Sequence, residues 1–186
     1  SITIRQSVNE LTVEADSPFE QGDTITLAVS YTITSAANRG FYLFPKGYVD
    51  EILPNGMEGK LEERLAYTMS EPYDARYWMP CNDLSYDKAM SSISVRVPKP
   101  FSVASNGLLQ DVIDREDGTQ VYHWKSFSPM ATYLMQTTAS IFTEYQEWYH
   151  RVSNPSDSIP VQYFIWQADY NETKTDRSSY NARNAF

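Results

Sequence analysis

The stretch TITLAVSYTIT, residues 24–34, carries the clearest secondary-structure pattern in this chain. Apolar side chains alternate strictly with small or polar ones along it, as on a strand, where successive side chains point to opposite faces. The larger, apolar members of the pattern are Ile25, Leu27, Val29, Tyr31 and Ile33. We predict a strand over these residues, with those five side chains directed into a core, because a one-residue shift would bury the threonine face instead.

Shorter stretches with the same alternation, or rich in β-branched and aromatic residues, lie on both sides of this segment, and no long window has helical periodicity. We predict further strands at residues 1–6, 10–15, 39–44, 91–97, 120–125, 133–144 and 160–168. Turn sequences separate them at residues 21–23, 54–56, 105–107, 116–118 and 154–156. Many short strands with this spacing favour an all-β, antiparallel β-sandwich over alternating strands and helices.

Two segments depart from the strand pattern. Residues 49–65 mix glycine and proline with carboxylates, so we expect an exposed acidic loop outside the sheets. Residues 171–186 are polar, and Ser178 or Ser179 is placed to cap a helix that only begins before the sequence stops. We therefore expect residues 1–170 to form one β domain cut from a longer protein, and residues 171–186 to lead into its next domain.

Composition excludes several classes of protein. A length of 186 residues fits one domain, or one domain and a fragment, and 41% hydrophobic against 21% charged residues is typical of a globular chain. The net charge of −9 disfavours nucleic acid and anionic membranes as partners. No apolar run approaches the ~20 residues of a membrane-spanning helix. Residues 1–6 lack the basic and apolar regions of a signal peptide, and the cellular compartment stays open.

The residues that carry most enzyme chemistry are scarce. Only two histidines occur, His123 and His150, and both fit packed or surface positions on strands better than a metal site. Cys81 is the single cysteine, which excludes an internal disulfide, and we expect it to be a small buried residue and not a nucleophile. Motifs for a nucleophilic serine or a nucleotide are absent. The chain therefore contains no complete catalytic set and no metal site.

The segment from Tyr67 to Ala89 is too irregular for a plain strand. It contains four carboxylates and two cations, and prolines at positions 72 and 80 restrict its backbone to a shaped loop. We expect a pair between Arg76 and either Asp74 or Asp83 to pin this loop. Glu71 is the carboxylate that we single out for a role beyond structure.

This segment resembles the N-terminal domain of the aminopeptidase N family of zinc metallopeptidases, which includes the leukotriene hydrolase relatives. The family pattern there is approximately T-Q-x-[QE]-x-x-D-A-R-x-x-[FLM]-P-C-x-D-E-P-x-x-K-A. Matching positions are Thr68, Glu71, Asp74, Ala75, Arg76, Met79, Pro80, Cys81, Asp83, Lys88 and Ala89. The strand ending at Pro98, the turn at residues 105–107 and the stretch at residues 131–134 follow at the family's spacing. The resemblance covers residues 11–168.

The resemblance implies a saddle-like antiparallel β-sandwich that precedes a thermolysin-like catalytic domain. That domain carries the zinc ligands and the motifs HExxH and GxMEN, none of which occurs here, so residues 171–186 would be the linker and the start of the catalytic domain. The parent protein would use zinc to remove N-terminal residues from peptides. This chain alone would bind no zinc and would not cleave peptides, and its partners would be the catalytic domain and the substrate.

The family's N-terminal domain lends one group to the active site, the [QE] residue that contacts the substrate's free α-amino group. Glu71 occupies that position, and a carboxylate facing an ammonium makes a charge-assisted hydrogen bond worth roughly 1.5–3 kcal/mol. Met69 stands where the family has its first glutamine, and Leu84-Ser85 replaces the family's E-P. The first change affects a second substrate contact, and the second affects the path of the loop after Cys81.

Two other readings remain open from the sequence. A carbohydrate- or protein-binding β-sandwich module would display a solvent-facing row of rings, for which Trp78, Trp124, Trp148 and Trp166 are the candidates. A purely structural domain would belong to a parent that had lost its zinc motif. Substrate side-chain preference, oligomeric state and the activity of the parent are also open.

Overall fold

The computed structural model describes residues 2–8, 10–33, 39–52, 58–61 and 63–167. The chain divides into two compact units, residues 1–32 and residues 33–186. The first unit contains one antiparallel hairpin, formed by β1 (Ile2–Gln6) and β2 (Leu11–Ala15). These two strands agree with the alternation predicted for residues 1–6 and 10–15.

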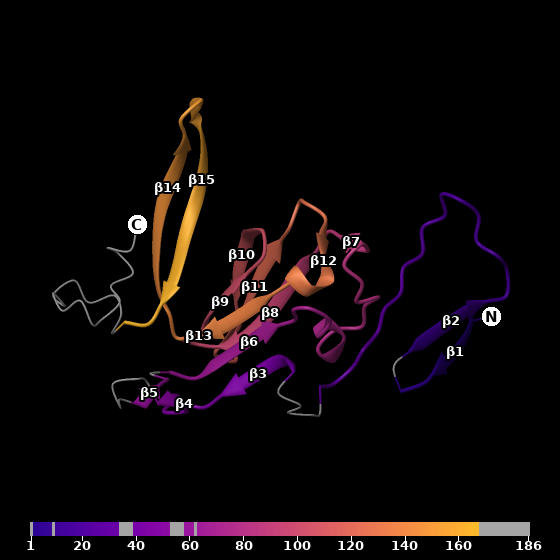
Figure 1. The fold of residues 1–186 in the computed structure, drawn as a ribbon, viewed down its shortest axis with the longest axis horizontal. Helices are drawn as coiled ribbons and strands as arrows, with labels where there is room; N and C mark the ends of the chain where they lie inside the picture. Colours follow the sequence, from indigo (N-terminus) through magenta and orange to yellow (C-terminus); the bar gives the residue numbers. More distant parts are fainter. Residues whose placement is uncertain (1, 9, 34–38, 53–57, 62, 168–186) are drawn as a thin grey trace. The chain divides into compact units, whose positions relative to one another are not determined.

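In the described residues of the second unit, the regular structure consists of strands and two short 3-10 helices, η1 (Ala75–Tyr77) and η2 (Thr132–Leu134) (Figure 1). Its longer strands are β3 (Gly40–Phe44), β6 (Leu65–Met69), β8 (Ser92–Pro98), β9 (Ser102–Ser105), β10 (Leu108–Asp114), β11 (Thr119–Lys125), β13 (Thr137–Ser140), β14 (Thr143–Arg151) and β15 (Asn154–Ile165). Its shorter strands are β4 (Val49–Ile52), β5 (Glu58–Lys60), β7 (Lys88–Ala89) and β12 (Met130–Ala131).

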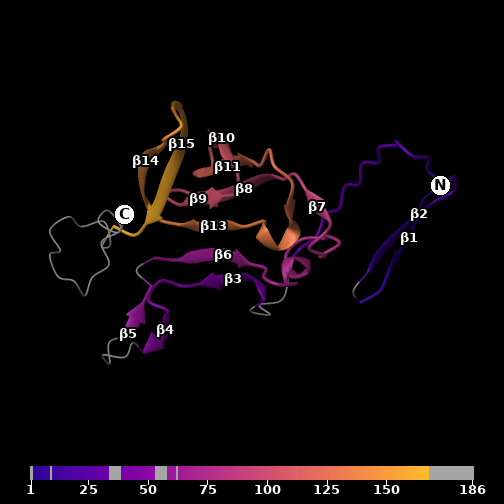
Figure 2. The same ribbon diagram turned by 45° about the horizontal axis from the view of Figure 1, so that its top comes forward.

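Two sheets make up the body of this unit. A four-stranded sheet has the order β3-β6-β13-β9, and a three-stranded sheet has the order β10-β11-β8. Every pairing is antiparallel. Figure 2 shows β3, β6 and β13 side by side in one layer, with β8, β10 and β11 in the other. The strands β14 and β15 form a separate long hairpin.

The two sheets meet in one hydrophobic core. Its buried members come from both layers, namely Val97, Tyr122 and Trp124 of the three-stranded sheet and Val103 and Ala139 of the four-stranded sheet. The indole Nε1 of Trp124 also donates a hydrogen bond to the carbonyl oxygen of Val103 at 3.1 Å, which ties the layers together. The all-β, antiparallel prediction is therefore confirmed.

The opposite face of the four-stranded sheet carries an aromatic cluster. The rings of Tyr42 on β3 and Tyr67 on β6 are directly opposite each other and stack with centroids 5.0 Å apart. Phe44 packs against Tyr67 at 6.0 Å and against Tyr48 at 4.5 Å. Because Ala66 on the same strand packs against the core, strand alternation sends Tyr67 to the outer face.

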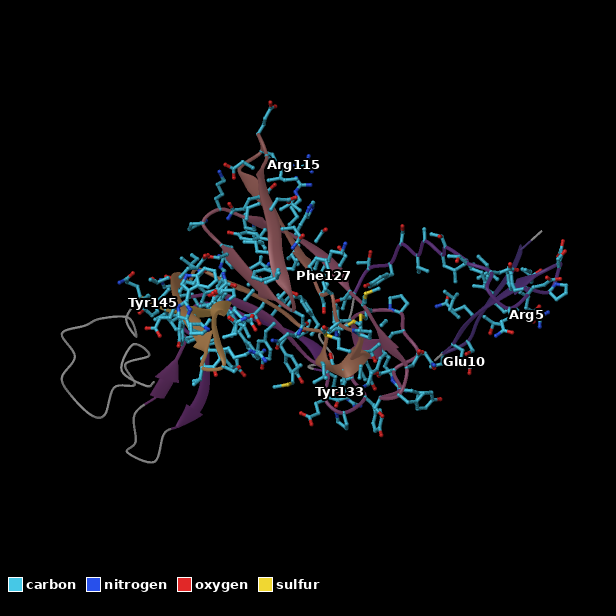
Figure 3. The ribbon with its side chains drawn as sticks, turned by 90° about the horizontal axis from the view of Figure 1, so that it is seen from above. Arg5, Glu10, Arg115, Phe127, Tyr133 and Tyr145 are labelled. Atoms are coloured by element: carbon cyan, nitrogen blue, oxygen red, sulfur yellow. The ribbon has the colours of Figure 1, made fainter. Side chains whose placement is uncertain are left out.

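The hairpins that leave this body end in exposed turns. Figure 3 shows Arg115 at the turn between β10 and β11, and Tyr145 on the β14–β15 hairpin. At the base of the latter, the ring of Phe164 packs edge-on against Trp124 with centroids 6.4 Å apart. The core therefore extends to the root of the hairpin.

The prediction for residues 24–34 is wrong. Residues 24–33 form no strand, and their apolar stripe is open to solvent, from 41% exposed at Ile33 to 58% at Leu27. Alternation makes a segment able to form a strand with one apolar face. A strand also needs a neighbour for its backbone hydrogen bonds and a layer to cover that face, and no described element supplies them here.

Some boundaries also differ from the sequence prediction. Residues 49–65 are not one loop, because β4 and β5 pair as a hairpin within them. The predicted strand at 133–144 is divided among η2, β13 and the start of β14. Residues 154–156, predicted as a turn, begin β15, and the turn falls at residues 152–153. The predicted turn at 54–56 and the tail at 171–186 lie outside the described residues.

Candidate functional site

The candidate site lies where β6 ends and the irregular segment begins. The alternation of the strand continues past its end, so that Thr68 and Ser70 are buried while Met69 and Glu71 are exposed. Met69 is 57% exposed. The Glu71 carboxylate makes no hydrogen bond or ion pair with any residue that the structure describes. An apolar and an acidic side chain, two residues apart, are thus both exposed at the end of β6.

The loop that follows Glu71 is closed by bonds to Ser70. The hydroxyl of Ser70, which is only 3% exposed, accepts a hydrogen bond from the indole Nε1 of Trp78 at 2.8 Å. The carbonyl oxygen of Ser70 accepts another from the backbone N–H of Asp74, also at 2.8 Å. Glu71 therefore stands on a loop whose two ends are joined.

Asp74 pairs with Arg39, a residue that sequence reasoning did not single out. One guanidinium nitrogen, Nη2, lies 2.6 Å from Asp74 Oδ1, and Nε lies 3.3 Å from Asp74 Oδ2. The third nitrogen, Nη1, donates to the hydroxyl of Tyr77 at 3.0 Å. Since 35 positions separate Arg39 from Asp74, no local pattern points to this contact.

Arg76 pairs with Asp83, one of the two partners that the sequence suggested. Its Nε lies 2.8 Å from Asp83 Oδ2, and this hydrogen bond raises the pKa of the Arg76 guanidinium. The Asp83 residue is 4% exposed, and its other oxygen accepts from the hydroxyl of Thr132 at 3.4 Å. A buried carboxylate held from two sides fixes the far end of the segment.

Cys81 lies between these contacts and is half-buried, not fully buried as expected. Burial raises the pKa of its thiol. The nucleophilic form of cysteine is the thiolate, so a raised pKa keeps this residue in its unreactive form near neutral pH. The expectation that Cys81 is not a nucleophile agrees with this environment.

The two histidines do not come together. His123 on β11 lies 2.9 Å from an oxygen of Asp111, and His150 on β14 lies 3.1 Å from the carbonyl oxygen of Pro155. Across the described ranges, no three His, Cys, Asp or Glu side chains gather as a metal-binding group. These residues do not fit a zinc site, which needs at least three such ligands at one point.

The four tryptophans do not form an exposed row. Trp124 is 3% exposed, whereas Trp148 on β14 is 55% exposed. Trp78 and Trp166 are half-buried, and their indole nitrogens donate to Ser70 and Ser140. This arrangement does not favour a carbohydrate-binding face. In the part of the chain that the structure describes, no helix is long and apolar enough to cross a membrane.

Comparison with known proteins agrees with the resemblance. Residues 1–134 match the family model for the peptidase M1 N-terminal domain. Probable aminopeptidase 2 of Sulfurisphaera tokodaii is 32% identical over 116 residues, which is 54% of this chain and 15% of that protein. Probable aminopeptidase 1 of Saccharolobus solfataricus is 34% identical over 77 residues, 41% of this chain and 10% of that protein. The chain thus matches only a small part of these relatives.

Solved structures share the fold at low sequence identity. The M1 zinc metallopeptidase from Deinococcus radiodurans superposes with a TM-score of 0.62 at 20% identity, over 87% of this chain and 34% of that one. A mutant two-domain M1 zinc metallopeptidase bound to L-tryptophan gives 0.65 at 18% identity, over 97% of this chain and 39% of that one. Because the family model matches residues 1–134, which is most of this chain, the chain belongs to the peptidase M1 N-terminal domain family.

Proposed function

We propose that this chain is the N-terminal domain of a zinc-dependent aminopeptidase and that Glu71 binds the α-ammonium group of the peptide substrate. In this proposal the zinc and the catalytic residues belong to a catalytic domain beyond this chain. The family membership, the two relatives named as probable aminopeptidases and the neighbours named as zinc metallopeptidases support it.

The observation that carries the role of Glu71 is its exposed carboxylate, which has no partner among the described residues. A group that binds a substrate's ammonium must be left unpaired by its own domain, whereas Asp74 and Asp83 are engaged by Arg39 and Arg76. In a site closed by a second domain, a carboxylate and an ammonium form a charge-assisted hydrogen bond. Such a contact selects peptides with a free N-terminus.

Met69 is the second proposed contact. It is exposed, two residues before Glu71, at the position where the family pattern that this segment resembles has glutamine. A thioether offers apolar, adaptable surface in place of the amide's donors and acceptor. We infer that Met69 contacts the substrate without a hydrogen bond.

Kinetics of the full-length protein test the role of Glu71. Glu71→Ala should lower kcat/KM for free peptides by roughly 10- to 200-fold, the equivalent of about 1.5–3 kcal/mol of transition-state binding. KM should rise, and the preference for a free over an acetylated N-terminus should fall. An exposed carboxylate contributes little to stability, so the variant should unfold as wild type does.

The matched control is Glu116→Ala, which removes an exposed glutamate from the turn between β10 and β11. It should leave both the rate and the amine preference unchanged. Equal effects of the two substitutions, or unchanged kinetics in Glu71→Ala, would show that Glu71 does not bind the substrate.

A further inference from the structure

The loop that presents Glu71 is seated on the beginning of β3. Strands β3 and β6 are antiparallel, so the start of β3 lies beside the end of β6, and Gly40 is paired with Met69. A Cβ placed on Gly40 would lie 2.3 Å from the carbonyl oxygen of Asp74. The backbone of the Glu71 loop therefore rests directly on Gly40, at a distance that only glycine permits.

Arg39, immediately before Gly40, is placed to hold that loop. Its guanidinium takes both carboxylate oxygens of Asp74, at 2.6 and 3.3 Å, and its remaining nitrogen reaches the hydroxyl of Tyr77. The guanidinium carbon also lies 4.6 Å from the centroid of the Tyr77 ring. One side chain thus contacts two residues of the segment by three hydrogen bonds and a cation–π contact.

These contacts are linked to Glu71 through two hydrogen bonds that Ser70 accepts. Asp74 donates its backbone N–H to Ser70, and Trp78, next to Tyr77, donates its indole N–H to the same residue. Ser70 is buried and directly precedes Glu71. A displacement of Asp74 or Tyr77 would therefore also displace the backbone at Ser70 and, with it, the Glu71 side chain.

We propose that Arg39 is a positioning residue for Glu71: it clamps Asp74 and Tyr77 so that the Glu71 carboxylate is held ready for the substrate's ammonium. This inference rests on the proposed function of Glu71. Lysine does not replace arginine here, because an ammonium on a flexible stem cannot engage both carboxylate oxygens and a hydroxyl in one plane.

The clamp serves the loop more than the stability of the whole domain. The Arg39 side chain is 55% exposed and the Asp74 side chain 14%, and an ion pair with one partner largely in water adds little to global stability. Removing it should therefore leave the two-sheet body folded while loosening residues 70–78. This separation of effects allows a test.

The first experiment is a double-mutant cycle in the full-length protein, with Arg39→Ala, Glu71→Ala and the combination. Arg39→Ala should raise KM for free peptides by about 3- to 10-fold with a smaller change in kcat, and should weaken the preference over acetylated peptides. If Arg39 acts through Glu71, its effect should vanish in the Glu71→Ala background. Arg39→Lys should recover less than half of the loss.

The control is Arg96→Ala. Arg96 is an exposed arginine on β8, and it is paired with the carboxylate of Asp117 in the turn between β10 and β11. This substitution should leave KM unchanged. Independent, multiplying effects of Arg39→Ala and Glu71→Ala would overturn the inference, as would an inert Arg39→Ala beside a damaging Glu71→Ala. An inert Glu71→Ala is a different result: the proposed function fails, and the positioning role fails with it.

The second experiment reads the loop directly and needs no zinc or substrate. Hydrogen exchange of the backbone amides of Asp74 and Tyr77, which donate to Ser70 and Asp74, should accelerate at least 5-fold in Arg39→Ala. The amide of Trp124 in the core should be unaffected. Tyr77→Phe keeps the ring and removes the hydroxyl that accepts from Arg39, so it should give a smaller acceleration of exchange in the same residues. This variant provides the test if Arg39→Ala fails to fold. Unchanged exchange in both variants would overturn the clamp.

Discussion

At the scale of single residues, Gly40 shows how a position without a side chain can fix a neighbouring loop. Its φ of +73° lies in the left-handed region, and a Cβ there would meet both the Asp74 carbonyl oxygen and the Tyr77 Cβ at 3.0 Å or less. Gly118, in the turn before β11, has a similar φ of +78° with nothing within 4 Å. The two glycines differ only in what surrounds them.

Substituting these two glycines separates backbone strain from steric clash. Gly118→Ala should lower the free energy of unfolding by about 1 kcal/mol, the cost of placing alanine at positive φ. Gly40→Ala should lower it by about 3 kcal/mol, because backbone atoms of the Glu71 loop must also move. Urea denaturation measures both values. Equal losses would mean that the loop does not rest on Gly40.

Met69 offers a second prediction at this scale. In the full-length protein, Met69→Gln should raise kcat/KM for free peptides by about 2- to 10-fold, since one new hydrogen bond beside Glu71 contributes about 0.5–1.5 kcal/mol. Steady-state kinetics measure the change. Met90→Gln is the control, because Met90 is 68% exposed and lies outside the Glu71 loop, between β7 and β8. A gain in both variants, or in neither, argues against Met69 as a substrate contact.

At the scale of elements, two segments with strand-like alternation adopt different structures: β8 is a strand in a sheet, and residues 24–33 form no strand. Val97 on β8 is 8% exposed, since β8 pairs with β11 and the other sheet covers its inner face. Leu27 has a pattern at least as regular, yet it is 58% exposed. The pattern marks which face of a strand would be apolar. Whether that face is covered depends on a neighbouring strand and on a second layer.

This difference predicts opposite responses to one substitution. Val97→Ser should reduce the free energy of unfolding by about 2–4 kcal/mol, because it removes buried apolar volume and adds a buried hydroxyl. Leu27→Ser should change it by no more than about 0.5 kcal/mol, as at other exposed positions. Thermal or urea unfolding of the two variants checks this, and a large loss in Leu27→Ser would show that the stripe is covered in solution.

At the scale of the whole molecule, this domain has a hydrophobic core and an exposed carboxylate at Glu71, while the described residues contain no group of side chains that could bind a metal. His123 and His150 are each engaged elsewhere, and three ligands are not found together within the described ranges. In the proposed aminopeptidase, the zinc ligands would come from residues outside these described ranges.

We expect the purified 186-residue chain to release no detectable product from aminoacyl chromogenic substrates, with or without added zinc. A chelator should leave its melting temperature unchanged, because the described residues form no metal-binding group that a chelator could empty. Spectrophotometric assays and thermal melts measure both quantities. Zinc-dependent turnover by this chain would contradict the assignment of chemistry to a separate domain.

Much of this architecture was readable from local pattern. The strands β1, β2, β3, β8 and β11 agree with their alternating stretches, and the turns at Gly107 and Gly118 fall where the sequence predicted them. The motif around residues 68–89 identified the family through residue types at fixed spacing. These features are predictable because period-two alternation, positive-φ glycines and motif spacing are each encoded within a few consecutive residues.

The tertiary structure decided everything that depends on a distant partner. It left the 24–33 stripe uncovered, and it paired Asp74 with Arg39, 35 positions away, while Asp83 paired with Arg76. A strand's neighbour and a carboxylate's partner are selected by long-range packing, for which the alternatives look identical in sequence. From the sequence alone, Asp74 and Asp83 are equally good partners for Arg76. Arg39 pairs with Asp74 because the loop packs against Gly40, the residue that follows Arg39.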